Sequence, residues 1–200
     1  MPRIFATLAS LSLGLYAAAL VLGLGIGDLY ESPEDEIQSI VAWKGTHLLT
    51  GAAAALAVVF VHSIVVTYFI GTNRWVKEVS ETYRFEGREL AQSTQLKRKT
   101  FPWCLTAMLT VVGVGALGAA SDPGTGRSGT ESVAIFHLFA ALTGLAYVGY
   151  TYFRAWNNIM AHQAVIERIL THVAEVRTEK GLETAEPVPG AIPVERAAAH

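Results

Sequence analysis

The sequence has few charged residues: 16% of its 200 residues are Asp, Glu, Lys or Arg, whereas 52% are hydrophobic. A soluble globular domain carries roughly 25% charged residues. The scarcity is local, because four long stretches contain almost no charge, and each reaches the roughly 20 residues that a helix needs to cross a bilayer. We therefore predict an all-α integral membrane protein, a four-helix bundle with spans at about 4–26, 43–72, 101–120 and 132–155.

Cysteine and intramembrane acids are also scarce. Cys104 is the only cysteine, which excludes an internal disulfide, a multi-cysteine metal site and the CxxCH motif of c-type haem. No predicted span contains Asp or Glu, which argues against a proton pump with a carboxylate relay and against a cation channel with an acidic ring. No span is broken at its middle, as in many transporters, since Pro102 is expected at the start of the third span.

Lysine and arginine are unevenly distributed among the loops. Residues 73–100 contain seven of them, whereas residues 28–41 contain five acids and no Lys or Arg. By the positive-inside rule, this bias predicts a multi-pass protein of a bacterial-type inner (plasma) membrane with both termini in the cytoplasm. The first apolar stretch exceeds the roughly 7–15 residues of a signal-peptide core, so we expect a retained helix. The net charge of −2 and the lack of any further basic cluster give no indication of nucleic-acid binding.

Charged sequence with helical periodicity follows two of the spans. It predicts a cytoplasmic helical loop at 73–100, inside the transmembrane domain of residues 1–156, and a cytoplasmic helical extension at 157–181 that ends with Gly181 as a C-cap. The Pro- and Ala-rich tail at 182–200 is predicted to be disordered. The helical extensions offer surfaces for other membrane or cytoplasmic subunits, and a homo-oligomer is an open alternative.

Two histidines are expected at the same depth in the membrane. His47 lies four residues into the second span and His137 five residues into the fourth. Both helices run inward from the outer face, so the two imidazoles should lie close to that face. Neutral imidazole is a good iron ligand, and two facing histidines can supply both axial ligands of a haem b.

Small residues follow both histidines on the same helical face. They leave room for a flat cofactor, although small residues also let membrane helices pack closely without one. They are Gly51, Ala54, Ala55 and Val58 after His47, and Ala140, Ala141 and Gly144 after His137.

These features resemble, in architecture alone, a four-helix membrane cytochrome b or membrane-anchor subunit over residues 3–156. The resemblance implies an electron-transfer subunit with one haem b near the outer face, bound by His47 and His137 as metal ligands and flanked by Gly51 and Gly144. His62 lies about 22 Å further inward, and its counterpart on the fourth span is Tyr152. A second bis-histidine haem is therefore not expected.

Several alternatives stay open. His62 is a candidate for a hydrogen bond to a quinone carbonyl, with Tyr152 or Tyr68 nearby, for a ligand shared across an oligomer interface, or for a hydrogen bond to a neighbouring helix. The chain would be at most a redox subunit of an oxidoreductase complex. It is alternatively a non-enzymatic structural or assembly subunit of a larger membrane complex, or a small transporter or metal-handling protein. His162 and His172 are expected at the solvated surface.

Landmarks shared by the two halves of the sequence indicate an internal duplication. Arg3-Ile-Phe5 resembles Lys99-Thr-Phe101, and THLL at His47 resembles FHLF at His137. The tripeptide TYF occurs at 67–69 and again at 151–153, but aligning it together with the histidines requires a six-residue deletion. A duplication would make the chain two tandem parallel hairpins, related by an axis along the membrane normal.

Overall fold

The computed structural model describes residues 1–26, 34–85, 87–126 and 128–182. These residues form four long α-helices and one short 3-10 helix: α1 (Pro2–Leu24), α2 (Glu34–Tyr83), α3 (Arg88–Ala120), η1 (Pro123–Thr125) and α4 (Thr130–Glu179). The chain is therefore all-helical in its described part, and all four α-helices are long and apolar enough to cross a membrane, as predicted. The tail predicted to be disordered lies, except for Leu182, outside the described residues.

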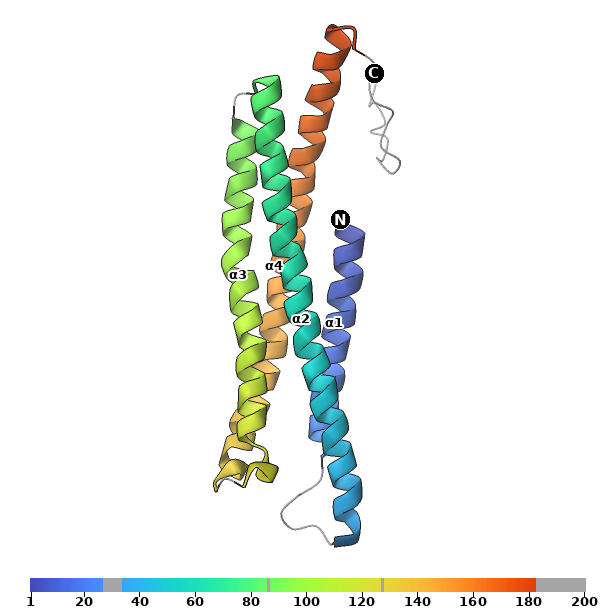
Figure 1. Ribbon diagram of the computed structural model, residues 1–200, viewed down its shortest axis with the longest axis vertical. Coiled ribbons are helices and arrows are strands. Elements are labelled where there is room, and N and C mark those ends of the chain that lie inside the picture. Colours follow the sequence, from blue (N-terminus) through green and yellow to red (C-terminus); the bar gives the residue numbers. More distant parts are fainter. Residues whose placement is uncertain (27–33, 86, 127, 183–200) are drawn as a thin grey trace, which may run out of the picture.

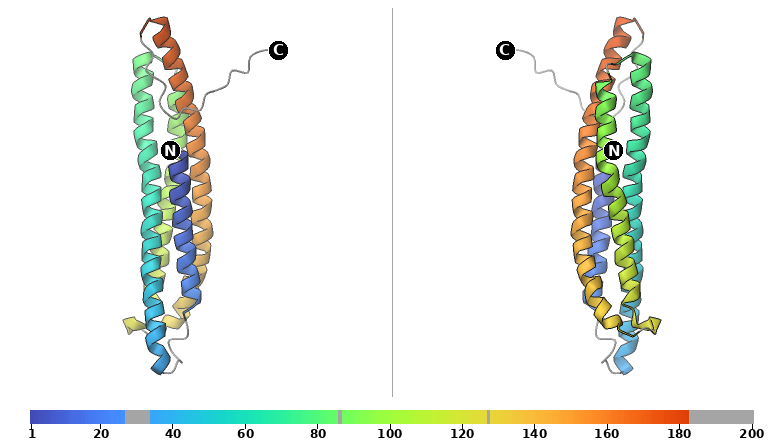
Figure 2. Two further views of the ribbon diagram at one scale, coloured as in Figure 1. Left: turned by 90° about the vertical axis from the view of Figure 1, so that its right-hand side faces the viewer. Right: turned by 90° about the vertical axis from the view of Figure 1, so that its left-hand side faces the viewer.

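The four α-helices pack side by side, and each runs opposite to the preceding one (Figure 1). α1 and α3 each pack against both α2 and α4, so α2 and α4 face each other across the centre (Figure 2). With 50 residues each, α2 and α4 measure roughly 75 Å, more than twice the roughly 30 Å thickness of a bilayer core. α1 is much shorter, and α2, α3 and α4 continue beyond its N-terminus as a three-helix extension (Figure 1).

Two helices begin well before the predicted spans. α2 begins at Glu34, inside the acidic segment expected to be a loop. α3 begins at Arg88, so Pro102 lies inside this helix and the expectation that it starts the helix is wrong. A proline at such a position removes one backbone hydrogen bond, yet α3 continues through it from its polar first part into its apolar second part.

The turn between α2 and α3 and the end of α4 rely on left-handed backbone. Arg84 has a φ of 57° and Gly87 a φ of 77°, and these two residues flank the reversal of the chain. At the end of α4, Gly181 has a φ of 66°, and its N–H donates to the carbonyl oxygen of Thr178. Glycine adopts this conformation without a Cβ clash. The C-cap of α4 is Lys180, so Gly181 lies one residue beyond the C-cap position predicted for it.

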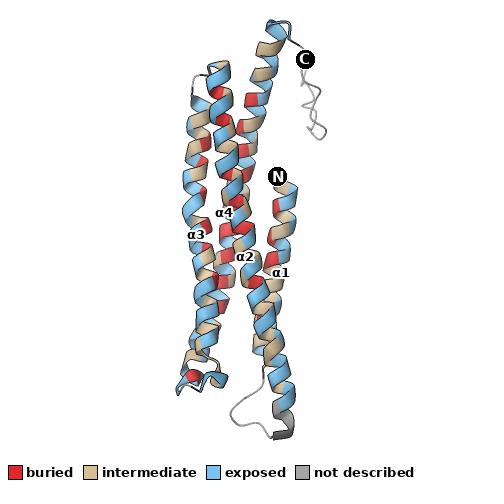
Figure 3. Cartoon of the chain, viewed as in Figure 1, coloured by how far each residue is buried: buried red, intermediate tan, exposed pale blue. Residues whose placement is uncertain are grey.

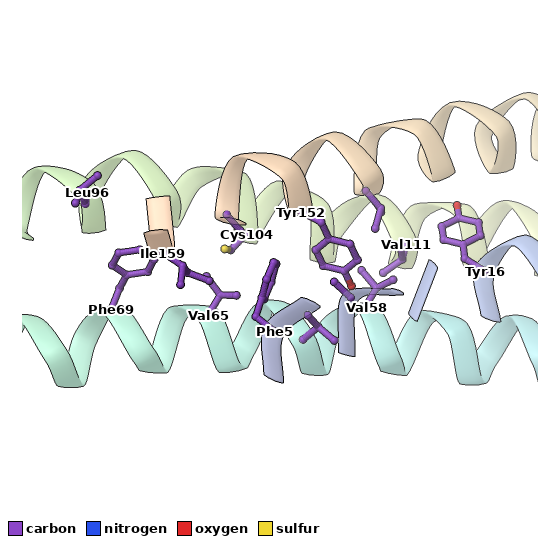
Figure 4. Packing of buried hydrophobic residues seen from close by; sticks show 14 of the residues in the cluster. Phe5, Tyr16, Val58, Val65, Phe69, Leu96, Cys104, Val111, Tyr152 and Ile159 are labelled. Carbon is purple, nitrogen blue, oxygen red and sulfur yellow. The ribbon is translucent and has the colours of Figure 1, made fainter. Parts of the chain in front are cut away.

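One cluster of buried apolar side chains runs along the inner faces of the helices (Figure 4). Val58, Val65 and Phe69 of α2 contribute to it, each at most 1% exposed. The outward faces also carry large apolar side chains: Leu49 and Leu56, for example, are 73% and 71% exposed. Figure 3 shows how these exposed faces surround the buried centre along much of the length of the helices.

The burial pattern of α2 recurs in α4 at an offset of 90 residues. Each residue from 54 to 70 has the same degree of exposure (buried, half-buried or exposed) as its counterpart from 144 to 160. The buried pairs are Ala54 and Gly144, Val58 and Val148, Val61 and Thr151, His62 and Tyr152, Val65 and Ala155, and Phe69 and Ile159. The two inner helices thus present matching faces to the centre.

This offset is the one that relates His47 to His137, whereas the two TYF tripeptides differ by 84 positions. The TYF match is therefore not a structural equivalence. The buried positions of α1 recur in α3 at an offset of 95 rather than 90, so the second half lacks five residues between its two matching helix faces. The buried pairs of α1 and α3 are Phe5 and Thr100, Ala9 and Cys104, Ser12 and Ala107, and Tyr16 and Val111.

Candidate functional site

His47 of α2 and His137 of α4 meet between the two helices. Their ring centres lie 6.2 Å apart and their ring planes differ by 74°. Both side chains belong to half-buried residues. The structure therefore brings together the two histidines that the sequence placed at equal depth.

Each imidazole is held by the helix that precedes its own in the chain. His47 Nδ1 lies 2.9 Å from the carbonyl oxygen of Ala19 in α1, and His137 Nδ1 lies 3.1 Å from the carbonyl oxygen of Val114 in α3. A carbonyl can only accept, so Nδ1 must carry the proton in both rings. A neutral imidazole in this tautomer offers the lone pair of Nε2 to a ligand or metal.

A glycine makes room for each ring. A Cβ on Gly23 would lie 2.8 Å from His47 Cε1, and one on Gly118 would lie 3.0 Å from His137 Cε1. Each glycine lies four residues after the carbonyl that holds the same ring. These glycines were not among the predicted site residues, although the Gly-rich ends of the first and third spans were a signal that could have indicated them.

The distance between the rings suits two-histidine coordination of one metal ion. Nitrogen–metal bonds of about 2.1 Å from both Nε2 atoms would place the ring centres roughly 6 Å apart. In the part of the chain that the structure describes, no group of three or more His, Cys, Asp or Glu side chains could hold a metal ion. The donor set thus fits the two axial positions of a haem better than it fits the four ligands of a zinc ion.

The two predicted flanking glycines have different surroundings. A Cβ on Gly51 would meet nothing within 4 Å, but one on Gly144 would lie 2.5 Å from the hydroxyl oxygen of Tyr16. Tyr16 reaches from α1 towards α3 and α4 (Figure 4) and covers the small-residue face of α4 on the inner side of His137. Tyr16 therefore leaves no room for a flat cofactor beside Gly144, and such a cofactor would have to lie further outward.

His62 and Tyr152 are stacked, with ring centres 4.7 Å apart, and their polar atoms bond within the chain. His62 is fully buried; its Nδ1 lies 2.9 Å from the carbonyl oxygen of Val58 and its Nε2 3.1 Å from Thr151 Oγ1. The Tyr152 hydroxyl lies 2.9 Å from Ser12 Oγ. Both nitrogens of His62 are thus engaged, one of them with the neighbouring helix α4.

His162 is completely buried, so the expectation that it lies at the solvated surface is wrong. Its Nδ1 lies 3.2 Å from the Tyr68 hydroxyl of α2, and its Nε2 lies 2.8 Å from Ser93 Oγ of α3. Burial lowers the pKa of this imidazole below its ordinary value. The difference arises because α3 begins as early as Arg88 and covers this face of α4. His172 is exposed, as predicted.

The polar contacts of His162 continue through the three-helix extension. Asn73 of α2 donates from Nδ2 to Ser93 Oγ at 3.0 Å. Lys97 Nζ of α3 donates to Asn73 Oδ1, also at 3.0 Å. This network links all three helices through directional contacts and so fixes how they are aligned along their lengths.

No protein-family model matches the chain, and no curated protein or solved structure is detectably similar to it. Fold alone does not define function. The functional assignment therefore depends on the chemistry of the residues themselves.

Proposed function

We propose that the chain is a membrane electron-transfer subunit, resembling a b-type cytochrome, that binds one haem b between α2 and α4. The observation that supports this proposal is the pair formed by His47 and His137, with ring centres 6.2 Å apart. When bound, a haem would supply reversible one-electron chemistry at its iron. Gly51 would flank it, whereas Tyr16 occupies the space beside Gly144, the other predicted flanking glycine.

The protein's own residues would bind and orient this group. His47 and His137 would hold it through Nε2, while the carbonyl groups of Ala19 and Val114 accept from Nδ1. Such outer contacts fix the orientation of a ligating histidine and make its free nitrogen a better donor. The half-buried setting would limit contact of the site with water.

Insertion in a membrane is part of the same proposal. Four candidate spans and the exposed apolar side chains around them suit a multi-pass protein surrounded by lipid. The excess of Lys and Arg at 73–100 supports cytoplasmic termini in an inner-membrane setting, with the two histidines near the outer face. Quinone is the proposed electron partner, but His62 would contact its carbonyl only after giving up one of its two internal hydrogen bonds.

A reduced-minus-oxidised visible spectrum tests the haem assignment. The full chain would be purified in mild detergent from a host supplied with haem. We expect an α-band near about 560 nm, the b-type signature of a bis-histidine haem. The band should disappear in His47→Ala and in His137→Ala, and it should persist in His172→Ala, which changes an exposed histidine. A full haem complement in His47→Ala would contradict the assignment.

A structural or assembly subunit of a larger membrane complex is the second candidate. The three-helix extension favours it, because α2, α3 and α4 project beyond α1 (Figure 1) and are held together by the network around His162. Folded protein that shows no visible absorbance, and that co-purifies with other subunits in fixed proportion, would favour this function. A self-associated chain of one kind would instead indicate a homo-oligomer.

A further inference from the structure

Arg154 is an arginine without an acidic partner. It is the only charged residue of α4 between Glu131 and Glu167, and the sequence from Glu89 to Asp122 contains no acid between these two. None of the ion pairs formed by the described residues involves Arg154. The charge of this side chain is therefore not balanced by a nearby carboxylate on α3 or α4.

Two aromatic rings orient the Arg154 guanidinium. Its central carbon lies 5.0 Å from the centre of the Trp103 ring and 5.8 Å from that of Tyr150. One of its N–H groups donates to the Tyr150 hydroxyl oxygen at 3.0 Å. A guanidinium has five N–H donors, and the remaining ones have no partner within the described part of the chain. Cation–π contacts thus hold the group in place while most of its donors stay available.

The position of this cluster along the helices matches the inner boundary of the predicted spans. Trp103 lies near the cytoplasmic start of the third span and Arg154 near the cytoplasmic end of the fourth. Tyr147, about two turns deeper than Arg154 on α4, contacts Thr106 at 2.6 Å. Lys99 lies one turn from Trp103 on the cytoplasmic side and is exposed. Tryptophan and tyrosine at headgroup level, with cations beside them, are typical of a membrane interface.

We propose that Trp103, Tyr150 and Arg154 form a binding site for the phosphate group of a phospholipid in the inner leaflet. The guanidinium fork matches two phosphate oxygens at once, and the aromatic rings would lie against the glycerol region. Lys99 adds a second positive charge, so the site should prefer an anionic phospholipid over a zwitterionic one. The inference depends on the membrane insertion proposed above and is independent of haem.

Native mass spectrometry of the full chain in mild detergent, titrated with phosphatidylglycerol, tests the site. We expect one phosphatidylglycerol to bind more tightly than the rest, and its affinity to fall roughly tenfold in Arg154→Gln, as for loss of a charge-assisted hydrogen bond. Arg154→Lys keeps the charge but lacks the forked guanidinium. Its affinity for phosphatidylglycerol should therefore lie between those of the wild type and Arg154→Gln. The matched control is Arg74→Gln, which changes an exposed arginine that is already paired with Glu78 at 2.9 Å and should have no effect.

Equal phosphatidylglycerol binding by the wild type and Arg154→Gln would overturn the proposal. It would also be overturned if inorganic phosphate displaced the tightest-bound lipid as readily as the lipid itself binds. If Arg154→Gln did not fold, judged by circular dichroism, Trp103→Leu would take its place and should also weaken binding. Release of the chain from membranes by alkaline carbonate would refute insertion itself, whereas an inserted chain with an unaffected Arg154→Gln would refute only the lipid site.

Discussion

His47 and His137 make matching contacts within the helix pairs α1–α2 and α3–α4. Each lies on the second helix of its pair, contacts a carbonyl of the first helix through Nδ1, and lies against a glycine of that helix. The two rings meet 6.2 Å apart. Two helices that present matching faces to each other bring matching residues together, which explains why one histidine per pair is enough to place two imidazoles side by side.

Substitution of Gly23 or Gly118 tests whether the glycines position the rings. We expect Gly23→Ala and Gly118→Ala each to displace a histidine and to lower the amount of haem bound per protein, measured by pyridine haemochrome absorbance. Gly14→Ala is the matched control on α1, because its Cβ would meet nothing within 4 Å. It should keep its haem and gain up to about 1 kcal/mol in unfolding free energy, since alanine is the better helix former. Equal haem content in all three variants would show that the ring positions do not depend on these glycines.

The Tyr16 hydroxyl is buried and has no hydrogen-bond partner among the described residues, whereas the Tyr152 hydroxyl contacts Ser12. Tyr16→Phe should leave the unfolding free energy unchanged or raise it by up to about 1 kcal/mol, because it removes an unpaired polar group. Tyr152→Phe should lower it by about 1–3 kcal/mol, because the buried Ser12 hydroxyl loses its partner. Unfolding by SDS titration in mixed micelles would measure both. A larger loss for Tyr16→Phe than for Tyr152→Phe would contradict the expectation.

The four helices and the proximity of His47 and His137 could be predicted from sequence because each follows from one helix at a time. The length of an apolar run indicates a candidate span, and 1.5 Å per residue places a side chain along it. The surroundings of Gly144 could not be obtained in this way. Small residues after His137 predict free space next to the helix, but which side chain fills that space depends on α1, whose Tyr16 occupies it.

His162 shows the same limit. Its position on the predicted cytoplasmic extension is typical of a residue at a solvated surface. Its burial results from Tyr68 of α2 and Ser93 of α3, and the position of Ser93 depends on how far α3 extends before Pro102. An interpretation of Pro102 as the first residue of the helix leaves that extension out. Contacts between helices determine both the surroundings of Gly144 and the burial of His162, and the periodicity of a single sequence does not reveal such contacts.

The buried imidazole of His162 should make the stability of the three-helix extension depend on pH. The groups that face it, Tyr68 and Phe69 of α2 and Ser93 of α3, include no charged side chain. Burial lowers the pKa of His162 in the folded state, so the unfolded state takes up a proton first as the pH falls. The stabilising contribution is therefore complete above the ordinary histidine pKa of about 6.5 and decreases below it, until the folded-state pKa is reached.

Thermal unfolding of the wild type between pH 7.5 and pH 5 would measure this dependence. His162→Gln should reduce stability at pH 7.5 but flatten its decrease towards acid, since glutamine does not titrate. His172→Gln, which changes an exposed histidine, should leave the decrease as it is in the wild type. An equally steep decrease in His162→Gln would assign the pH dependence to another group.

The contact between Tyr16 and Gly144 allows a double-mutant test of the packing beside the two histidines. Gly144→Ala places a Cβ 2.5 Å from the Tyr16 hydroxyl oxygen, and such overpacking typically costs about 1–3 kcal/mol. In Tyr16→Phe the hydroxyl is gone, so Gly144→Ala should range from nearly neutral to stabilising by up to about 1 kcal/mol, the gain in helix propensity. SDS unfolding of the wild type, both single variants and the double variant would give the coupling free energy. We expect it to show that Gly144→Ala is tolerated only without the hydroxyl. Independent effects of the two substitutions would mean that Tyr16 does not cover Gly144. The proposed flat cofactor could then extend further inward along α4 from His137.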